Sequence, residues 1–142
     1  MAEAETIQVD IVSAEGEIYS GPALELVAPA TEGDLGIHPR HAPLLTLLKA
    51  GEVRLTSPDG EKHFFFVGGG ALEIQPRKVT VLADTALRAK DLDEAAAVAA
   101  KQRAEEALKD RSGKITQAEA LAELTRSIAQ LKMIERLRKL RG

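Results

Sequence analysis

The sequence predicts an antiparallel β-sandwich or flattened barrel, followed by an antiparallel hairpin of two helices. Two observations predict this fold. Up to Asp84, short segments alternate apolar and polar residues and are broken by Gly and Pro, which is typical of strands joined by tight turns. Beyond Asp91 no Pro occurs, and Ala, Leu, Glu, Lys, Arg and Gln recur at helical spacing. We therefore expect a β domain over residues 1–87 and a helical domain over residues 88–142.

Composition places the chain among soluble globular proteins, because 44% of its 142 residues are hydrophobic and 29% are charged. The apolar run over residues 64–72 is far shorter than the roughly 18 residues that a membrane span needs. The acidic start lacks an apolar stretch, so we expect no signal peptide. Cysteine is absent, which excludes disulfides and thiolate metal sites and is compatible with the cytoplasm.

Six segments show the alternation of half-buried strands: 6–12, 23–28, 52–56, 63–67, 71–75 and 78–83. In the first of them, Ile7, Val9 and Ile11 share one face. A turn with Pro at its second position is expected over residues 57–60, and a second turn at Pro76-Arg77. No segment with helical period interrupts the strands, which argues against a parallel α/β sheet.

A possible metal site lies at residues 34–41, where Asp34, His38 and His41 are residue types that bind zinc. Pro39 would break a helix that aligned them, and no fourth ligand lies nearby in the sequence. A surface turn is therefore the preferred interpretation, and we expect no metal.

Two glycine-containing segments also invite a functional interpretation. Gly68-Gly69-Gly70 is followed by neither Lys nor a helix start, so a close hairpin or bulge between strands is favoured over a phosphate loop. Residues 32–36 are acidic and glycine-rich, and they predict a turn, since a calcium loop needs more oxygen ligands. His63 has no evident catalytic partner, and nothing in the sequence indicates an enzyme.

Charge is distributed unevenly along the chain. Residues 1–87 hold 13 acidic and 6 basic side chains, whereas residues 88–142 hold 9 acidic and 13 basic ones. Much of the basic excess lies close to the C-terminus, at Lys132, Arg136, Arg138, Lys139 and Arg141. These charges either complement the dipole of their own helix or meet an acidic partner.

Each expected helix begins with the pattern of a capping box, Asp91-x-x-Glu94 for the first and Thr116-x-x-Glu119 for the second. The connection over residues 110–115 contains Ser112-Gly113 and is short, so the helices should be antiparallel neighbours.

The predicted contact faces of the two helices differ in side-chain size. The first is mostly alanine and consists of Leu92, Ala96, Ala99, Ala100, Ala104 and Ala107. The second is leucine- and isoleucine-rich and consists of Leu121, Leu124, Ile128, Leu131, Ile134 and Leu137. Alanine buries little apolar surface but favours the helix, so the helices should form readily and adhere weakly. Two alternatives remain open, a permanently docked hairpin and helices that separate.

Several ordered motifs resemble one known family. They are DIVSAEG at residues 10–16, EGDLGIHPRHAPLLT at 32–46, FVGGGALEI at 66–74 and VTVLADTA at 79–86. In this order and at these separations they are similar to the epsilon subunit of the bacterial F-type ATP synthase, which is called delta in mitochondria. The resemblance covers essentially the whole chain, including the order of β domain and two helices.

The resemblance implies a noncatalytic subunit of the central stalk in a proton-translocating motor. The sandwich would bind the gamma subunit and the loops of the c-ring, with Glu32, Asp34 and His41 near the c-ring. The helices would extend toward the alpha and beta subunits and inhibit ATP hydrolysis. The basic residues Arg136, Arg138 and Lys139 would then face an acidic segment of the beta subunit. The chain would lie peripherally on the cytoplasmic face of the bacterial inner membrane, without inserting into it.

Some relatives bind ATP at a motif Ile/Leu-Asp-x-x-Arg-Ala, which residues 92–97 match except that Ala96 replaces the arginine. The resemblance thus implies at most a weak ATP site, formed by Leu92, Asp93, Arg103 and Arg126, and no other cofactor. A freestanding ATP-sensing module is the alternative function. An RNA-binding adaptor is disfavoured because the chain lacks aromatic residues placed to stack on bases.

Overall fold

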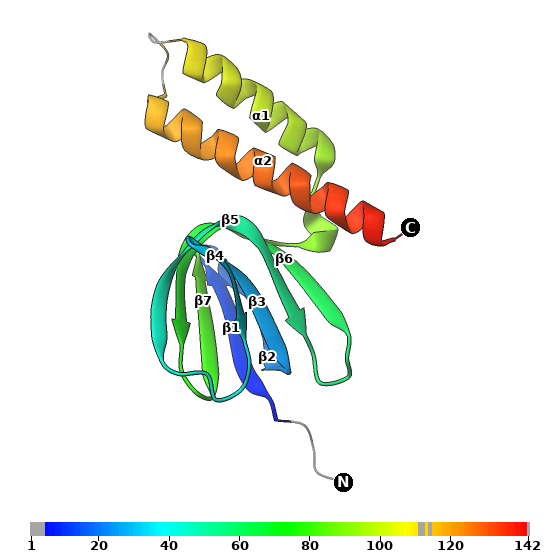
Figure 1. The fold of residues 1–142 in the computed structure, drawn as a ribbon. Helices are drawn as coiled ribbons and strands as arrows, with labels where there is room; N and C mark the ends of the chain where they lie inside the picture. Colours follow the sequence, from blue (N-terminus) through cyan, green and yellow to red (C-terminus); the bar gives the residue numbers. More distant parts are fainter. Residues whose placement is uncertain (1–4, 111–112, 114, 142) are drawn as a thin grey trace. The chain divides into compact units, whose positions relative to one another are not determined.

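The structure, a computed structural model, describes residues 5–110, 113 and 115–141. The chain forms two compact units, and the boundary between them in the sequence lies between Lys90 and Asp91 (Figure 1). In the described residues the first unit has the strands β1 (Ile7–Ser13), β2 (Gly16–Ala23), β3 (Glu25–Ala30), β4 (Gly33–Ile37), β5 (Leu44–Thr56), β6 (Lys62–Ile74), β7 (Lys78–Ala83) and β8 (Ala86–Arg88). A short 3-10 helix, η1 (Ala89–Asp91), follows β8. The second unit has the helices α1 (Glu94–Lys109) and α2 (Gln117–Leu140).

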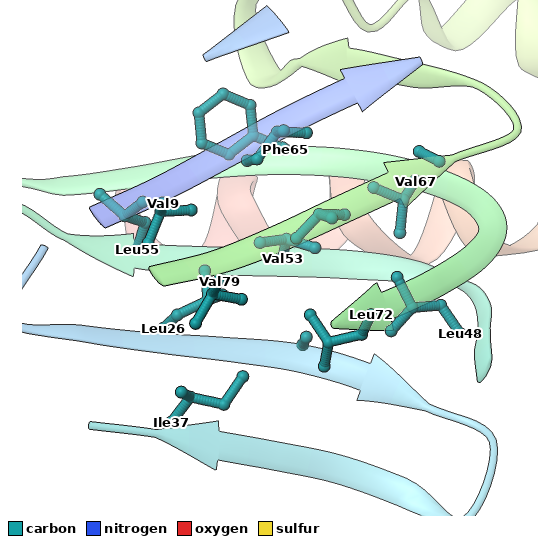
Figure 2. Packing of buried hydrophobic residues seen from close by; sticks show 14 of the residues in the cluster. Val9, Leu26, Ile37, Leu48, Val53, Leu55, Phe65, Val67, Leu72 and Val79 are labelled. Atoms are coloured by element: carbon teal, nitrogen blue, oxygen red, sulfur yellow. The ribbon is translucent and has the colours of Figure 1, made fainter. Parts of the chain in front are cut away.

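The strands form one folded-over sheet in the order β2-β1-β7-β6-β5-β3-β4, with β8 paired to β6. Apolar side chains from both layers fill the space between them, among them Val9, Leu26 and Phe65 (Figure 2). All three are at most 1% exposed, and each buried side chain of this size stabilises the fold by about 1.5–3 kcal/mol. The predicted sandwich followed by two helices is confirmed.

The long strands β5 and β6 each belong to both layers of the sandwich. The first part of β6 pairs with β8 and its last part with β7, while both parts stay paired with β5. The predicted strands 63–67 and 71–75 are therefore one strand that bends at Gly68–Gly70. Gly70 has φ 141°, and a Cβ on it would lie 2.0 Å from the carbonyl oxygen of Leu82. This contact requires glycine because no side chain fits between the two backbones.

The structure corrects the predicted sheet in two respects. β1 and β7 are parallel, so the sheet is not wholly antiparallel. The prediction also lacked β2, β4, β8 and the first part of β5. At β2 and β4 the reason is that their glycines, and Pro22 on β2, are typical of turns. β2 tolerates Pro22 since it is an edge strand, and only Thr31 and Glu32 form the turn that leads into β4.

A polar network ties β1 to β2 and β7 on the outside of the sheet. Ser20 Oγ donates to Asp10 Oδ1 over 2.7 Å, and Gln8 Nε2 donates to the same oxygen over 3.0 Å. Lys78 Nζ lies 3.0 Å from Asp10 Oδ2. The hydrogen bonds from Gln8 and Ser20, followed by the interactions with Lys78, lower the pKa of Asp10.

The predicted capping box is present at the start of one helix and absent at the start of the other. At α2 the capping box of Thr116 and Glu119 is confirmed. At α1 the predicted box is wrong, because the N-cap is Asp93, whose carboxylate accepts from the backbone N–H of Ala96 over 3.1 Å. Asp91 instead ends η1, so the chain passes through an extended residue before the helix begins.

The connection between the helices follows Lys109, where α1 ends, and precedes Gln117. Ser112 of the predicted connection lies outside the described residues. Its neighbour Gly113 donates its backbone N–H to the carbonyl oxygen of Asp110 over 3.3 Å.

The helices pack against each other, and the predicted contact faces are confirmed only in part. In α1 the buried residues are Ala97 and Ala104, which are seven residues apart. Ala104 belongs to the predicted face, whereas the predicted Ala96 and Ala99 are exposed. In α2 the fully buried residues are Ala120, Ser127 and Met133. The predicted Leu121 is 56% exposed, and the other predicted residues are half-buried: Leu124, Ile128, Leu131, Ile134 and Leu137. Four of these five buried residues are Ala or Ser, and Met133 is the one large side chain among them.

Replacing Gly70 by Ala should destabilise the first unit by several kcal/mol, because the new Cβ would clash with the backbone of Leu82. Thermal or urea unfolding followed by circular dichroism measures this effect. The matched control is Gly36→Ala, where a Cβ would meet nothing within 4 Å and the change should be nearly neutral. Equal unfolding midpoints for the two variants would contradict the structural role of Gly70.

Replacing Asp10 by Asn should cost about 1–2 kcal/mol of unfolding free energy at neutral pH, since hydrogen bonds to a charged group are lost. The folded pKa of Asp10 is below the ordinary value of 3.8, so its contribution is fully present above that value. It disappears as the pH falls through the lower folded pKa. Unfolding curves of the two proteins should therefore differ at neutral pH and converge in strong acid. A difference that is independent of pH would contradict this assignment.

Candidate functional site

An exposed apolar row crosses the outer face of β5, β6 and β7. Leu47 pairs with Ala71, and Ala71 pairs with Leu82, so the three side chains lie on the same side of the sheet. Leu47 is 64% and Leu82 48% exposed, and Leu45, two residues before Leu47, is 71% exposed. The leucine row, as we call Leu45, Leu47 and Leu82, is the kind of contiguous apolar surface that proteins use for docking.

Sequence reasoning missed the leucine row. The signal was present in the run Leu44–Leu48, where residues on both faces of the strand are apolar apart from Thr46. A strand with one face in the core and one in water normally alternates apolar and polar residues. The failure of that alternation in β5 is what indicates a second apolar face.

Two of the predicted c-ring residues, Glu32 and Asp34, lie close together at one end of β4. Glu32 is exposed in the turn between β3 and β4, and Asp34 lies on β4 with its side chain 61% exposed. Arg54 Nη2 on β5 lies 3.5 Å from Asp34 Oδ2 and reaches it across β3. The negative charge of Asp34 is thus accompanied by a partly exposed guanidinium group.

The third predicted residue, His41, lies toward the other end of β4. Strands rise roughly 3.3 Å per residue, so the five residues of β4 alone hold the ends roughly 13 Å apart. His41 follows a turn in which Arg40 has φ 68° and donates its N–H to the carbonyl oxygen of Pro76 over 2.9 Å. The structure therefore does not bring His41 together with Glu32.

The surface turn around residues 38–41 has ordinary polar contacts. His38 Nε2 lies 3.7 Å from Glu25 Oε2, and His41 Nδ1 lies 2.7 Å from the carbonyl oxygen of Ala42. In the part of the chain that the structure describes, no group of three or more His, Asp or Glu side chains is arranged to hold a metal ion.

The basic end of α2 is engaged inside the helical unit. Arg138 Nη2 forms an ion pair and hydrogen bond with Glu94 Oε2 at the start of α1. Lys139 Nζ lies 3.5 Å from Glu135 Oε1, one turn earlier on α2. Two of the residues predicted to contact the beta subunit therefore already have carboxylate partners in this conformation.

The residues of the predicted ATP site are spread along the helices. Asp93 caps the start of α1, while Arg103 lies ten residues further on, roughly 15 Å along the helix axis. Arg103 Nη2 lies 3.3 Å from Glu123 Oε1, which is one turn before Arg126 on α2. Leu92 and Asp93 are thus grouped at one end and the two arginines at mid-hairpin.

Comparison with models of known protein families shows to which family the chain belongs. Residues 6–89 match the β-sandwich domain of the ATP synthase delta/epsilon chain. Residues 90–135 match the long α-helix domain of the same chain. The chain belongs to the ATP synthase delta/epsilon family. Members of this family are noncatalytic subunits of ATP synthase, which agrees with the absence of a catalytic pattern in the sequence.

Curated relatives in the delta/epsilon family are similar over nearly the full chain. An ATP synthase epsilon chain of Nitrosococcus oceani is 64% identical and covers 98% of this chain, with 99% of the relative matched. An epsilon chain of Alkalilimnicola ehrlichii is 61% identical and covers 94% of this chain, with 96% of the relative matched. The family resemblance predicted from the motifs is confirmed.

Solved structures share the fold of this delta/epsilon family member. A chain of the Euglena gracilis mitochondrial ATP synthase (OSCP/F1/c-ring) has a TM-score of 0.68 at 16% identity and covers 96% of this chain and 82% of that chain. A chain of the Tetrahymena thermophila mitochondrial ATP synthase (central stalk/c-ring) has a TM-score of 0.62 at 13% identity, and the match covers 94% of this chain and 99% of that chain. Among the described residues, no helix is long and apolar enough to cross a membrane.

Proposed function

We propose that this chain is a central-stalk subunit of an F-type ATP synthase, which couples the gamma subunit to the c-ring and restrains ATP hydrolysis through its helices. The observation that carries the docking part is the leucine row on an otherwise complete sandwich. The chains with the same fold in the Euglena and Tetrahymena enzymes come from assemblies named for the c-ring, and one of them for the central stalk. Family membership and this surface together support the proposal.

The leucine row is the surface that docks on the gamma subunit. Leu45 and Leu47 have most of their surface in water, and Leu82 nearly half, although the strands that carry them also contribute to the core. Covering these side chains with an apolar partner removes this surface from water at a gain of about 25 cal/mol per Å2. A subunit that must stay attached to a rotating stalk needs such a permanent apolar contact.

Glu32 and Asp34 form the candidate contact with the loops of the c-ring. Both are exposed and lie within three residues of each other at a hairpin turn, where a loop of a partner has access. Arg54 beside Asp34 favours a partner that offers both a donor and an acceptor. His41 belongs to a separate contact, since β4 lies between it and Glu32.

The helical unit provides the regulatory part of the proposal. α1 fully buries only Ala97 and Ala104, and each methyl group contributes only about 0.8 kcal/mol. Both helices have their own caps, at Asp93 and Thr116, so they remain helical without each other. The helices can therefore separate and extend toward the alpha and beta subunits, where Arg136, Arg138 and Lys139 meet an acidic segment.

The proposed location follows from the proposed assembly. As a peripheral subunit attached to the c-ring, the chain lies at the cytoplasmic face of the bacterial inner membrane and does not enter it. The freestanding ATP-sensing module gains no support, because Asp93 and Arg103 lie roughly 15 Å apart along α1 and each already contacts another group.

Placing aspartates at Leu47 and Leu82 should weaken binding to an F1 complex that contains gamma but lacks this chain. The affinity should fall by at least about tenfold, because two charges would be buried in an apolar contact. Surface plasmon resonance measures the loss, and circular dichroism checks the fold. The control Lys62→Asp places an aspartate at an exposed site beside the β5–β6 turn. Wild-type affinity for the double variant would refute docking through the leucine row.

A chain that ends at Lys90 should still bind the stalk, because it keeps all eight strands and the leucine row. The ATPase activity of the assembled complex should then rise several-fold, since the inhibitory helices are gone. ATP hydrolysis by purified F1 with the full or shortened chain tests this. An unchanged rate would reject the regulatory role and leave the docking role intact.

A further inference from the structure

Opposite charges gather at one end of the helical hairpin. Because α1 and α2 are antiparallel, the start of α1 lies beside the end of α2. The start of α1 and the residues just before it are acidic, at Asp91, Asp93 and Glu94. The end of α2 is basic, at Arg136, Arg138, Lys139 and Arg141. The charge pattern of the hairpin end is thus complementary within the chain itself.

Arg138 and Glu94 join the two charged ends directly. Arg138 Nη2 is bonded to Glu94 Oε2, and the two residues are 44 positions apart in the sequence. Charges at the helix ends also stabilise their own helices, because carboxylates are favoured at a helix start and cations at a helix end. That local stabilisation persists when the helices separate, whereas the Glu94–Arg138 pair exists only while they lie together.

We propose that the acidic start of α1 is an internal competitor for the basic end of α2, with Glu94 masking Arg138 while the hairpin is closed. The acidic segment of an external partner must displace Glu94 before Arg138 can bind it. This proposal deepens the proposed function, since it rests on the basic end of α2 being the group that inhibits hydrolysis. The masking contact itself is a property of the isolated chain.

The contact between Arg138 and Glu94 is strong enough to shift the equilibrium between the closed and the separated hairpin, but too weak to hold the hairpin closed permanently. The side chains of Arg138 and Glu94 are 64% and 51% exposed, and an exposed ion pair changes an equilibrium by at most about fivefold. A bias of this size matters here because α1 fully buries only two alanines. It is also screened by salt, so the closed fraction should fall as ionic strength rises.

The first experiment measures hairpin opening in the full-length chain without the motor. The chain has no cysteine, so Ala95→Cys and Leu140→Cys allow two spin labels at exposed sites near the charged end. Double electron–electron resonance then gives the separated fraction. Glu94→Gln should raise that fraction by up to about fivefold and remove most of its salt dependence. The control Glu105→Gln neutralises an exposed carboxylate further along α1 and should leave the fraction unchanged.

The second experiment separates the inference from the function on which it rests. Exchanging the charges, with Glu94→Arg and Arg138→Glu, should return the separated fraction toward the wild-type value. In the assembled F1 complex, Glu94→Gln should inhibit ATP hydrolysis more strongly than wild type, and the exchanged pair should inhibit less. An unchanged separated fraction in Glu94→Gln overturns the masking contact. A raised fraction with unchanged ATPase activity instead overturns the inhibitory role of the basic end.

Discussion

The close approach of β6 and β7 at Gly70 is the constraint on which the first unit depends. The backbone of Gly70 lies so near the carbonyl oxygen of Leu82 that a Cβ has no room. A similar contact occurs on β5, where a Cβ on Gly51 would lie 2.9 Å from Pro29. Because Gly51 and Gly70 have no side chain, β5 and β6 can bend while they stay paired. The hairpin of β5 and β6 thus contributes to both layers of the sandwich and closes it around the core.

The bend in β5 also shapes the leucine row, which is the proposed docking surface. In its first part β5 pairs with β6 in the register around Leu47, and the outward-facing Leu45 and Leu47 are left exposed. In its second part Val53 and Leu55 enter the core, and Arg54 faces outward toward Asp34. A single strand thus contributes to the core, to the apolar row and to the polar turn region, because its two faces change environment where it changes layer.

The helical unit is held together differently from the sandwich. Large apolar side chains fix the sandwich, whereas the helices combine strong capping, small buried residues and exposed ion pairs such as Arg103–Glu123. Each helix start is capped by residues of its own sequence, and the ion pairs between the helices are partly exposed and therefore screened by salt. This difference is consistent with the proposed function, in which the sandwich docks and the helices change position. The same charges serve the closed hairpin and the proposed external contact.

The sequence by itself determined the fold class, the second helix cap at Thr116 and the family, because periodicity, capping and ordered motifs are local properties. The tertiary structure decided the parallel pairing of β1 with β7, the continuity of β6 through its glycines and the strand β4. It also decided that His41 lies apart from Glu32 and that Glu94 meets Arg138. These features depend on which distant segments lie side by side, and local patterns of side chains do not encode that.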